Sequence, residues 1–210
     1  MRIADKKVEE YAREHTKPAP ELLERLEDFT CEEMPESDML TGRVEGRFLK
    51  LIAKTSGAKN VFECGTFTGY SALSMAEALP EDGKVITCER NPERRKVAEE
   101  YFSKSPHGSK IEIRFGDALE SLKNESTPLD LIFLDADKER YPEYYEEAVS
   151  KLSSGGIIVI DNTLWDGEVL EPESKSAKAI AKMNEKIASD SRVENVLLTV
   201  RDGIQFVVKR

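Results

Sequence analysis

The sequence predicts an α/β protein with a doubly wound, mostly parallel sheet and helices on both of its faces. Through the middle of the chain, short apolar segments rich in β-branched residues alternate with longer helical patterns. At the end of the chain, two apolar segments are separated only by Arg201, Asp202 and Gly203. That link permits a hairpin but not a crossover, so the last of seven expected strands should run antiparallel.

The length and composition suit one globular domain with a single core, since the chain has 210 residues. The formal net charge of −10 disfavours broad binding to the phosphate backbone of a nucleic acid. A local patch of basic residues remains compatible with this net charge. The three cysteines form no CxxC pair, and Cys64 and Cys88 fall near the ends of strand-like segments. Free cysteines at such positions are usually core residues, which predicts a reducing compartment.

Residues 1–37 are expected to form a helical N-terminal cover, and residues 38–210 the core of the same domain. Apolar residues recur at helical spacing on both sides of an interruption, and Pro20 suits the start of the second helix. The segment covers the sheet or, alternatively, contributes to a dimer surface or a substrate lid. The absence of an apolar signal segment and of any membrane-length apolar run predicts a cytoplasmic protein without membrane contacts.

The elements then follow in order along the chain. Residues 38–57 predict a turn and a helix, which Gly57 should end. The alternation places parallel strands at 60–64, 84–89, 110–115, 130–135 and 157–161. Helices are expected between them at 70–79, 92–103, 118–123 and 141–152, and the tail adds a helix at 174–188 and strands at 193–200 and 204–208.

Two of the buried strands stop abruptly on oxygen donors. Asp135 and Asp137 follow one strand, and Asp161 and Asn162 follow the next. The carboxyl ends of neighbouring parallel strands meet at one edge, where such sheets bind ligands. We therefore expect an oxygen-ligand metal site there, with Lys138 beside it, and such ligands favour Mg²⁺, or Mn²⁺ or Ca²⁺, over Zn²⁺. The structural alternative is that these side chains only cap a helix or form an Asx turn.

The beginning of the sheet carries the features of a nucleoside site. Gly65 and Gly69 lie between the first strand and its helix, where glycine permits a tight turn and close approach of a ligand. Their spacing is not GxGxxG, so a pyrophosphate cradle is less favoured. Glu89 ends the second strand, where it can bind ribose hydroxyls or, alternatively, be a solvated turn residue. Residues 116–118 follow the third strand, and either the Asp117 side chain or the backbone there would lie near an adenine.

Together these motifs resemble those of the metal- and S-adenosylmethionine-dependent O-methyltransferases. The resemblance rests on Glu-Cys-Gly-Thr-Phe-Thr-Gly-Tyr-Ser at 63–71, Leu-Asp-Ala-Asp-Lys at 134–138, Asp-Asn-Thr-Leu-Trp at 161–165 and the acidic tip of the second strand. The family includes the catechol and caffeoyl-CoA enzymes and small bacterial relatives. It implies a Rossmann-like class I methyltransferase fold, a seven-stranded sheet with an antiparallel last strand. The similarity covers roughly residues 38–210.

The resemblance also implies a role for individual residues. The contacts to S-adenosylmethionine would come from the strand tips and loops, at Thr41, Glu63, Gly65, Phe67, Ser71, Glu89, Asp117, Ala118 and Asp135. The metal ligands would be Asp135, Asp161 and Asn162, with Lys138 as the general base and Asp135 beside it in the catalytic group. A cation close to Lys138 would disfavour its ammonium form.

The resemblance implies methyl transfer to a metal-chelated hydroxyl of a catechol-like or caffeoyl-type phenol, because two adjacent oxygens can chelate one ion. A hydroxylated tRNA uridine is the alternative acceptor, against which the negative net charge counts. A nicotinamide-dependent oxidoreductase and a non-catalytic cofactor-binding protein are disfavoured. A homodimer is expected, as in homologous folds. The role of Asp137 stays open, and Trp165 either walls an aromatic substrate or anchors its loop.

Overall fold

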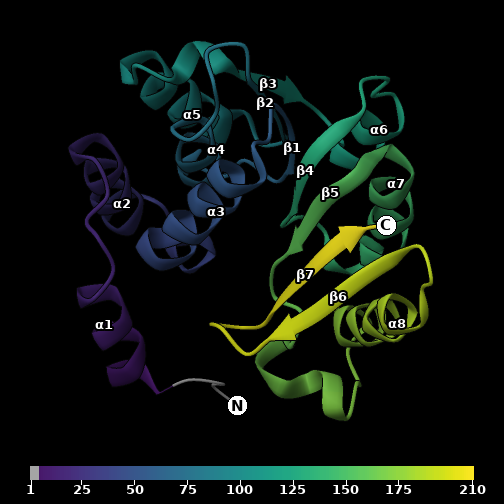
Figure 1. The fold of residues 1–210 in the computed structure, drawn as a ribbon. Coiled ribbons are helices and arrows are strands. Elements are labelled where there is room, and N and C mark those ends of the chain that lie inside the picture. The colour runs from purple at the N-terminus through teal and green to yellow at the C-terminus, as the bar shows by residue number, and fades with distance from the viewer. Residues whose placement is uncertain (1–4) are drawn as a thin grey trace.

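Seven strands form one sheet through the middle of the molecule (Figure 1). This computed structural model describes residues 5–210; residues 1–4, which belong to the expected N-terminal cover, lie outside the described residues. The strands are β1 (Asn60–Cys64), β2 (Lys84–Glu89), β3 (Ile111–Phe115), β4 (Leu129–Leu134), β5 (Leu152–Ile160), β6 (Val193–Leu198) and β7 (Ile204–Lys209). Their order across the sheet is β3-β2-β1-β4-β5-β7-β6.

The last strand runs against its neighbours. The pairs from β3 across to β5 are all parallel, whereas β7 lies between β5 and β6 and is antiparallel to both. Parallel neighbours need a crossover connection, which the intervening helices supply, while β6 and β7 are joined by a hairpin. The predicted α/β fold with an antiparallel last strand is therefore confirmed.

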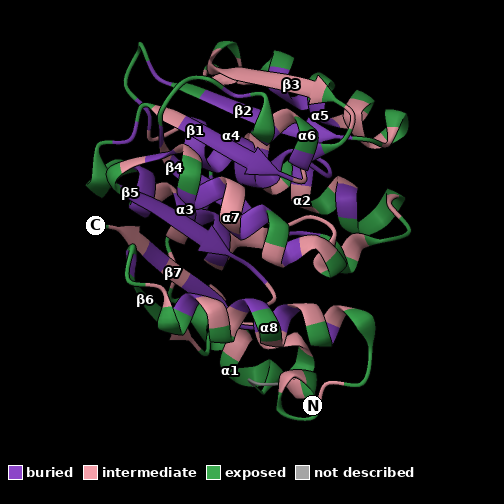
Figure 2. Cartoon of the chain, turned by 90° about the vertical axis from the view of Figure 1, so that its right-hand side faces the viewer, coloured by how far each residue is buried: buried purple, intermediate pink, exposed green. Residues whose placement is uncertain are grey.

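Both faces of the central strands are buried, which explains why these strands are almost continuously apolar. Successive residues point to opposite faces, so Val61 and Phe133 belong to one core cluster while Phe62 and Ile158 belong to the other. Figure 2 shows the buried strands inside a more exposed outer layer.

Helices cover the two faces of the sheet (Figure 1). One face carries α2 (Glu21–Glu33), α3 (Gly42–Ser56), α4 (Tyr70–Ala76) and α5 (Pro92–Lys104). The other face carries α6 (Ala118–Lys123), α7 (Tyr141–Lys151) and α8 (Lys175–Ser189). The helix α3 ends as expected at Gly57, which has the left-handed conformation that glycine adopts at low cost.

The N-terminal segment forms two helices with different surroundings. In α2, Leu23 and Leu26 are buried in the core, so this helix is a cover of the sheet. In α1 (Lys6–Glu14) no residue is buried, and Val8 and Tyr11 are exposed. The helix α2 thus packs on the core, whereas α1 lies beside the cavity described below, and the division into an N-terminal cover and a core stays a prediction.

Some element bounds differ from the predicted ones for structural reasons. The strand β5 begins at Leu152, because that residue already pairs with Leu129 of β4 beyond an irregularity in the ladder. The helix α4 ends at Ala76, and its continuation tightens into two i→i+3 turns. The strand β6 ends at Leu198, so the connection to β7 spans residues 199–203 rather than 201–203.

All three cysteines are free; Cys64 and Cys88 are buried neighbours in the paired strands β1 and β2, and Cys31 is exposed. Burial raises the pKa of the Cys64 thiol, as expected for a core cysteine. Within residues 5–210, no helix is long and apolar enough to cross a membrane.

Candidate functional site

The carboxyl ends of the parallel strands border one large cavity of about 1540 Å³. Segments that follow β1, β2, β3, β4 and β5 line it, as is usual for open α/β sheets. The remaining wall comes from α1, from Glu27 and Cys31 of α2, from residues 37–44 and from residues 199–202. Ligand pockets commonly measure about 300–1,000 Å³, so this cavity has room for a nucleoside and a second molecule.

The loop after β1 lies directly against the end of β4. Gly65 has a φ of +102°, and a Cβ at this position would come within 2.1 Å of the Asp135 carbonyl oxygen. The backbone N–H of Asp135 also donates to the Cys64 carbonyl at 3.0 Å. The expected nucleoside loop and the acidic tip of β4 are thus held together through the main chain.

Backbone donors fix the Glu89 carboxylate at the tip of β2. One oxygen accepts a hydrogen bond from the Phe67 N–H at 2.9 Å, and the other accepts from Arg90 and Asn91 at 2.9 and 2.8 Å. A carboxylate can accept about four hydrogen bonds, so capacity remains for a ribose hydroxyl. Glu89 is 6% exposed and lines the cavity, which excludes the alternative of a solvated turn residue.

The predicted adenine residues Asp117 and Ala118 line the same cavity after β3. Asp117 caps α6 by accepting the Glu120 N–H at 2.9 Å, and its other oxygen pairs with Arg140 at 2.6 Å. Arg140 ends the short 3-10 helix η3 (Lys138–Arg140). One ion pair therefore connects the end of β3 with the turn that carries Lys138.

Two of the predicted cofactor residues do not line the cavity. Glu63 is fully buried within β1, where it accepts a hydrogen bond from the Thr87 hydroxyl at 2.5 Å. Burial raises the pKa of Glu63 to about 8, against the hydrogen bonds from Ser71 and Thr87. Ser71 is likewise buried, in α4. Thr41, by contrast, lines the cavity from the start of α3.

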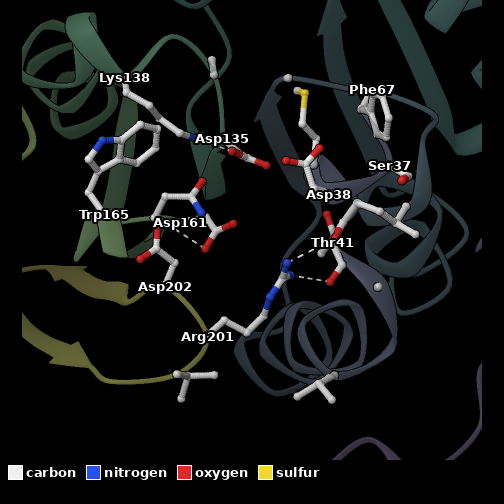
Figure 3. Close-up of a pocket in the computed structure, with 18 of the residues that line it drawn as sticks. Ser37, Asp38, Thr41, Phe67, Asp135, Lys138, Asp161, Trp165, Arg201 and Asp202 are labelled. Carbon is white, nitrogen blue, oxygen red and sulfur yellow. Dashed lines mark hydrogen bonds and ion pairs between the residues drawn. The ribbon is translucent and has the colours of Figure 1, made fainter. Parts of the chain in front are cut away.

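Lys138 is turned toward the acidic tip of β4 (Figure 3). Its ammonium donates to Asp135 at 2.5 Å and to the Tyr141 hydroxyl at 2.7 Å. Burial by itself lowers the pKa of Lys138, but the charges and hydrogen bond of Asp135, Tyr141 and Asp161 together outweigh it, and the pKa lies above its ordinary value. Without a cation, the ion pair stabilises the charged lysine, and the loss of the ammonium form beside a bound cation stays a prediction.

Asp161 and Asn162 follow β5 and line the same cavity. Asp161 is 5% exposed and accepts the Asn162 backbone N–H at 2.8 Å. Burial and the neighbouring charge of Asp135 raise the pKa of Asp161 to about 6. A buried carboxylate and a partly exposed one that repel each other, with an amide beside them, fit a hard divalent cation.

The metal assignment nevertheless depends on that amide. Among residues 5–210, no group of three or more His, Cys, Asp and Glu side chains is placed to hold a metal ion. A cation held by Asp135 and Asp161 would therefore need Asn162 as its third protein ligand, and this ligand set stays a prediction.

Two open roles receive a structural answer. Asp137 caps η3 by accepting a hydrogen bond from the Glu139 N–H at 3.2 Å. Helix capping is the structural alternative to metal binding given above for this residue. Trp165 lines the cavity and also packs against the core cluster under α7 and α8. It therefore both borders the cavity and anchors its loop.

The tyrosines of α7 are more than packing residues. The Tyr141 hydroxyl, fully buried, accepts from Lys138 and donates to the Asp161 carbonyl at 3.1 Å. The Tyr145 hydroxyl donates to Asp190 at 2.9 Å, and Tyr144 lines the cavity.

An ion pair between a buried carboxylate and an arginine that lines the cavity was not recognised from the sequence. Glu45 of α3 is fully buried and binds Arg201 of the β6–β7 connection. Glu45 lies one turn before Leu49 on the apolar face of its helix, and a charge on a buried face requires a partner. That position was an available signal, but nothing in the sequence identifies a partner 156 residues away.

Proteins of known family resemble this chain over most of its length. A family model described as O-methyltransferase matches residues 13–210. The chain is 36% identical over 200 residues to caffeoyl-CoA O-methyltransferase 5 of Nicotiana tabacum, covering 88% of this chain and 82% of that protein. It is 36% identical over 184 residues to catechol O-methyltransferase domain-containing protein 1 of Mus musculus, covering 84% and 70%. The solved O-methyltransferase from Bacillus cereus in complex with SAH has a TM-score of 0.88 and 29% identity, covering 97% of both chains.

Proposed function

The chain belongs to the O-methyltransferase family, of the caffeoyl-CoA and catechol type, and we propose that it methylates one hydroxyl of a phenol with two adjacent hydroxyls. The methyl donor is S-adenosylmethionine, because the similar Bacillus cereus structure holds SAH, which the donor becomes when it loses its methyl group. The relatives named for caffeoyl-CoA and catechol support an aromatic acceptor.

One observation carries the proposal. The glycine loop after β1 and the oxygen donors after β4 and β5 meet in a single cavity, joined at Gly65 and Asp135. A methyl donor held by the loop would therefore lie next to an acceptor held by the oxygen donors. That proximity is the main requirement of an in-line transfer, because orientation can supply about 7–11 kcal/mol of the barrier.

On the donor side, Glu89 would bind the ribose with its remaining acceptor capacity, and Asp117 and Ala118 would border the adenine. Thr41, Gly65 and Phe67 would border the rest of the cofactor.

On the acceptor side, Asp135, Asp161 and Asn162 would hold a divalent cation, for which Mg²⁺ is the best match to the donor set. The cation would lower the pKa of the acceptor hydroxyl and fix its position. Lys138 would take up the hydroxyl proton in its neutral form. This role requires the Asp135 carboxylate to be engaged elsewhere, since their ion pair stabilises the ammonium.

The decisive experiment follows labelled methyl from S-adenosylmethionine into catechol, a caffeoyl ester and bulk tRNA, with Mg²⁺ and with EDTA. We expect labelling of the phenols that EDTA abolishes. Labelling of tRNA alone would overturn the acceptor class, and labelling of phenols that resists EDTA would overturn the metal. If SAH binds but neither acceptor is labelled, the phenol assignment fails while the family membership stands.

A further inference from the structure

The connection between β6 and β7 carries an arginine that reaches across the cavity (Figure 3). Arg201 has a φ of +51°, an uncommon backbone conformation for a residue with a side chain. Its guanidinium donates to the Thr41 carbonyl at 2.5 Å, to the Leu40 carbonyl at 3.2 Å and to the Glu45 carboxylate. Leu40 and Thr41 line the opposite wall of the cavity, and the fully buried Glu45 follows them in the first turn of α3.

These contacts concern the segment that would border the methyl donor. Leu40 and Thr41 both line the cavity immediately before α3. The Thr41 side chain at the N-cap position makes no capping hydrogen bond within the described part of the chain. Because the C=O and N–H of a trans peptide point in opposite directions, holding the two carbonyls with one guanidinium also fixes the direction of the N–H groups that follow them.

The β6–β7 connection is also hydrogen-bonded to the loop after β5, which would border the acceptor. The carbonyl oxygens of Asp202 and Gly203 accept the N–H groups of Leu164 and Thr163 at 2.9 and 3.0 Å. A Cβ on Gly203 would come within 2.4 Å of the Leu164 side chain, so the two segments are in close contact. This loop continues directly from Asn162 to Trp165.

We propose that Arg201 is a positioning residue for methyl transfer, which holds the donor wall at Leu40 and Thr41 in register with the acceptor loop. This inference rests on the proposed function, because it assigns those two walls to donor and acceptor. In-line transfer is sensitive to such spacing, since a displacement of about 1 Å can cost roughly 100-fold in rate. The planar guanidinium suits the task, because it presents a fixed fork of donors that lysine lacks.

The test compares Arg201→Lys with Arg192→Lys. Arg192 lies just before β6, makes several bonds to Asp190 and Glu146, and is remote from the cavity lining, so it is a matched control. Since Arg201→Lys can leave Glu45 poorly paired in a buried place, the double variant Glu45→Gln, Arg201→Gln removes both charges together. For each variant, kcat, the KM of both substrates, the melting temperature and the Kd of SAH in EDTA are measured.

We expect Arg201→Lys and the double variant to lower kcat at saturating substrates by about tenfold or more. We also expect them to weaken SAH binding severalfold, whereas Arg192→Lys changes neither quantity. A purely structural role would lower the melting temperature and leave kcat of the folded protein unchanged, which would overturn the proposal. A change in KM alone would also overturn it.

The SAH measurement separates this inference from the proposed function. If the wild-type protein methylates no phenol, the proposed function fails and the rate comparison does not apply. In that case, the inference is supported if both Arg201 variants bind SAH severalfold more weakly than Arg192→Lys does. It is overturned if both Arg201 variants bind SAH as tightly as the wild type.

Discussion

Gly65 approaches Asp135 so closely that the tips of β1 and β4 form one unit. A Cβ on Gly65 would come within 2.1 Å of the Asp135 carbonyl oxygen. The backbone N–H of Asp135 also donates a hydrogen bond to the carbonyl of Cys64, the residue before Gly65. The separation between the proposed donor loop and the proposed acceptor group is thereby set by backbone contact. A side chain at position 65 must disturb both.

Gly65→Ala is expected to weaken SAH binding by about tenfold or more, because the added methyl group collides with the main chain of β4. The measurement is calorimetric titration with SAH, together with a thermal melt. Gly155→Ala is the matched control: Gly155 also has a positive φ, +76°, but a Cβ there meets nothing within 4 Å. Both variants carry backbone strain of about 1–2 kcal/mol. Equal SAH affinity in the two variants would contradict the role of the close contact.

Asp161→Asn is expected to abolish Mg²⁺-dependent methylation while sparing SAH binding. The change removes one of two carboxylates from the proposed metal group, but an amide can still accept the Asn162 N–H. Since it also removes repulsion with Asp135, the melting temperature in EDTA should not fall. Asp82→Asn, at an exposed carboxylate paired with Lys59, is the control. Full Mg²⁺-dependent turnover in Asp161→Asn would refute the metal assignment.

Tyr141→Phe is expected to reduce kcat by roughly tenfold without changing SAH affinity. The lost hydroxyl accepts from Lys138 and donates to the Asp161 carbonyl, and hydrogen bonds to charged groups contribute about 1.5–3 kcal/mol. Steady-state kinetics at saturating substrates measure the effect. Tyr145→Phe removes a hydroxyl from the same helix whose partner is Asp190, away from the cavity lining. The same kcat in both variants would mean that Tyr141 serves packing alone.

The acid stability of the fold should depend on Asp190. A hydrogen bond from Arg192 is the main cause that holds the pKa of Asp190 below its ordinary value of 3.8, although burial opposes it. The unfolded chain therefore takes up the proton at a higher pH than the folded protein does. The ionised carboxylate stabilises the fold above about pH 4, and this contribution is lost as the pH falls further.

Thermal melts between pH 7 and pH 2.5 check this expectation for Asp190→Asn. The variant should melt below the wild type at pH 7, and the difference should shrink below about pH 4. Glu173→Gln, at an exposed residue without a hydrogen bond or ion pair to any of residues 5–210, should show no such difference. A gap that persists at pH 2.5 would rule out the charge of Asp190 as its source.

The order of the elements could be predicted because it depends on local patterns. The mostly apolar segment at β4 indicates a strand that is buried on both faces. The link between β6 and β7 is too short for a crossover, so β7 must run antiparallel to β6. The location of the site at the carboxyl ends of the strands could be predicted in the same way, because parallel strands bring Asp135 and Asp161 to one edge of the sheet. Seven of the nine predicted cofactor residues do line the cavity, but their roles stay predictions.

Only the tertiary structure decided which partners the charged groups have. The sequence could not pair Glu45 with Arg201, because the contact joins residues 156 positions apart and depends on how the hairpin packs. Nor could it give the ionisation of Lys138, since burial and the charge of Asp135 act in opposite directions and their distances decide the outcome. Periodicity and strand tips are encoded in neighbouring residues, whereas electrostatic environments arise only when distant segments meet.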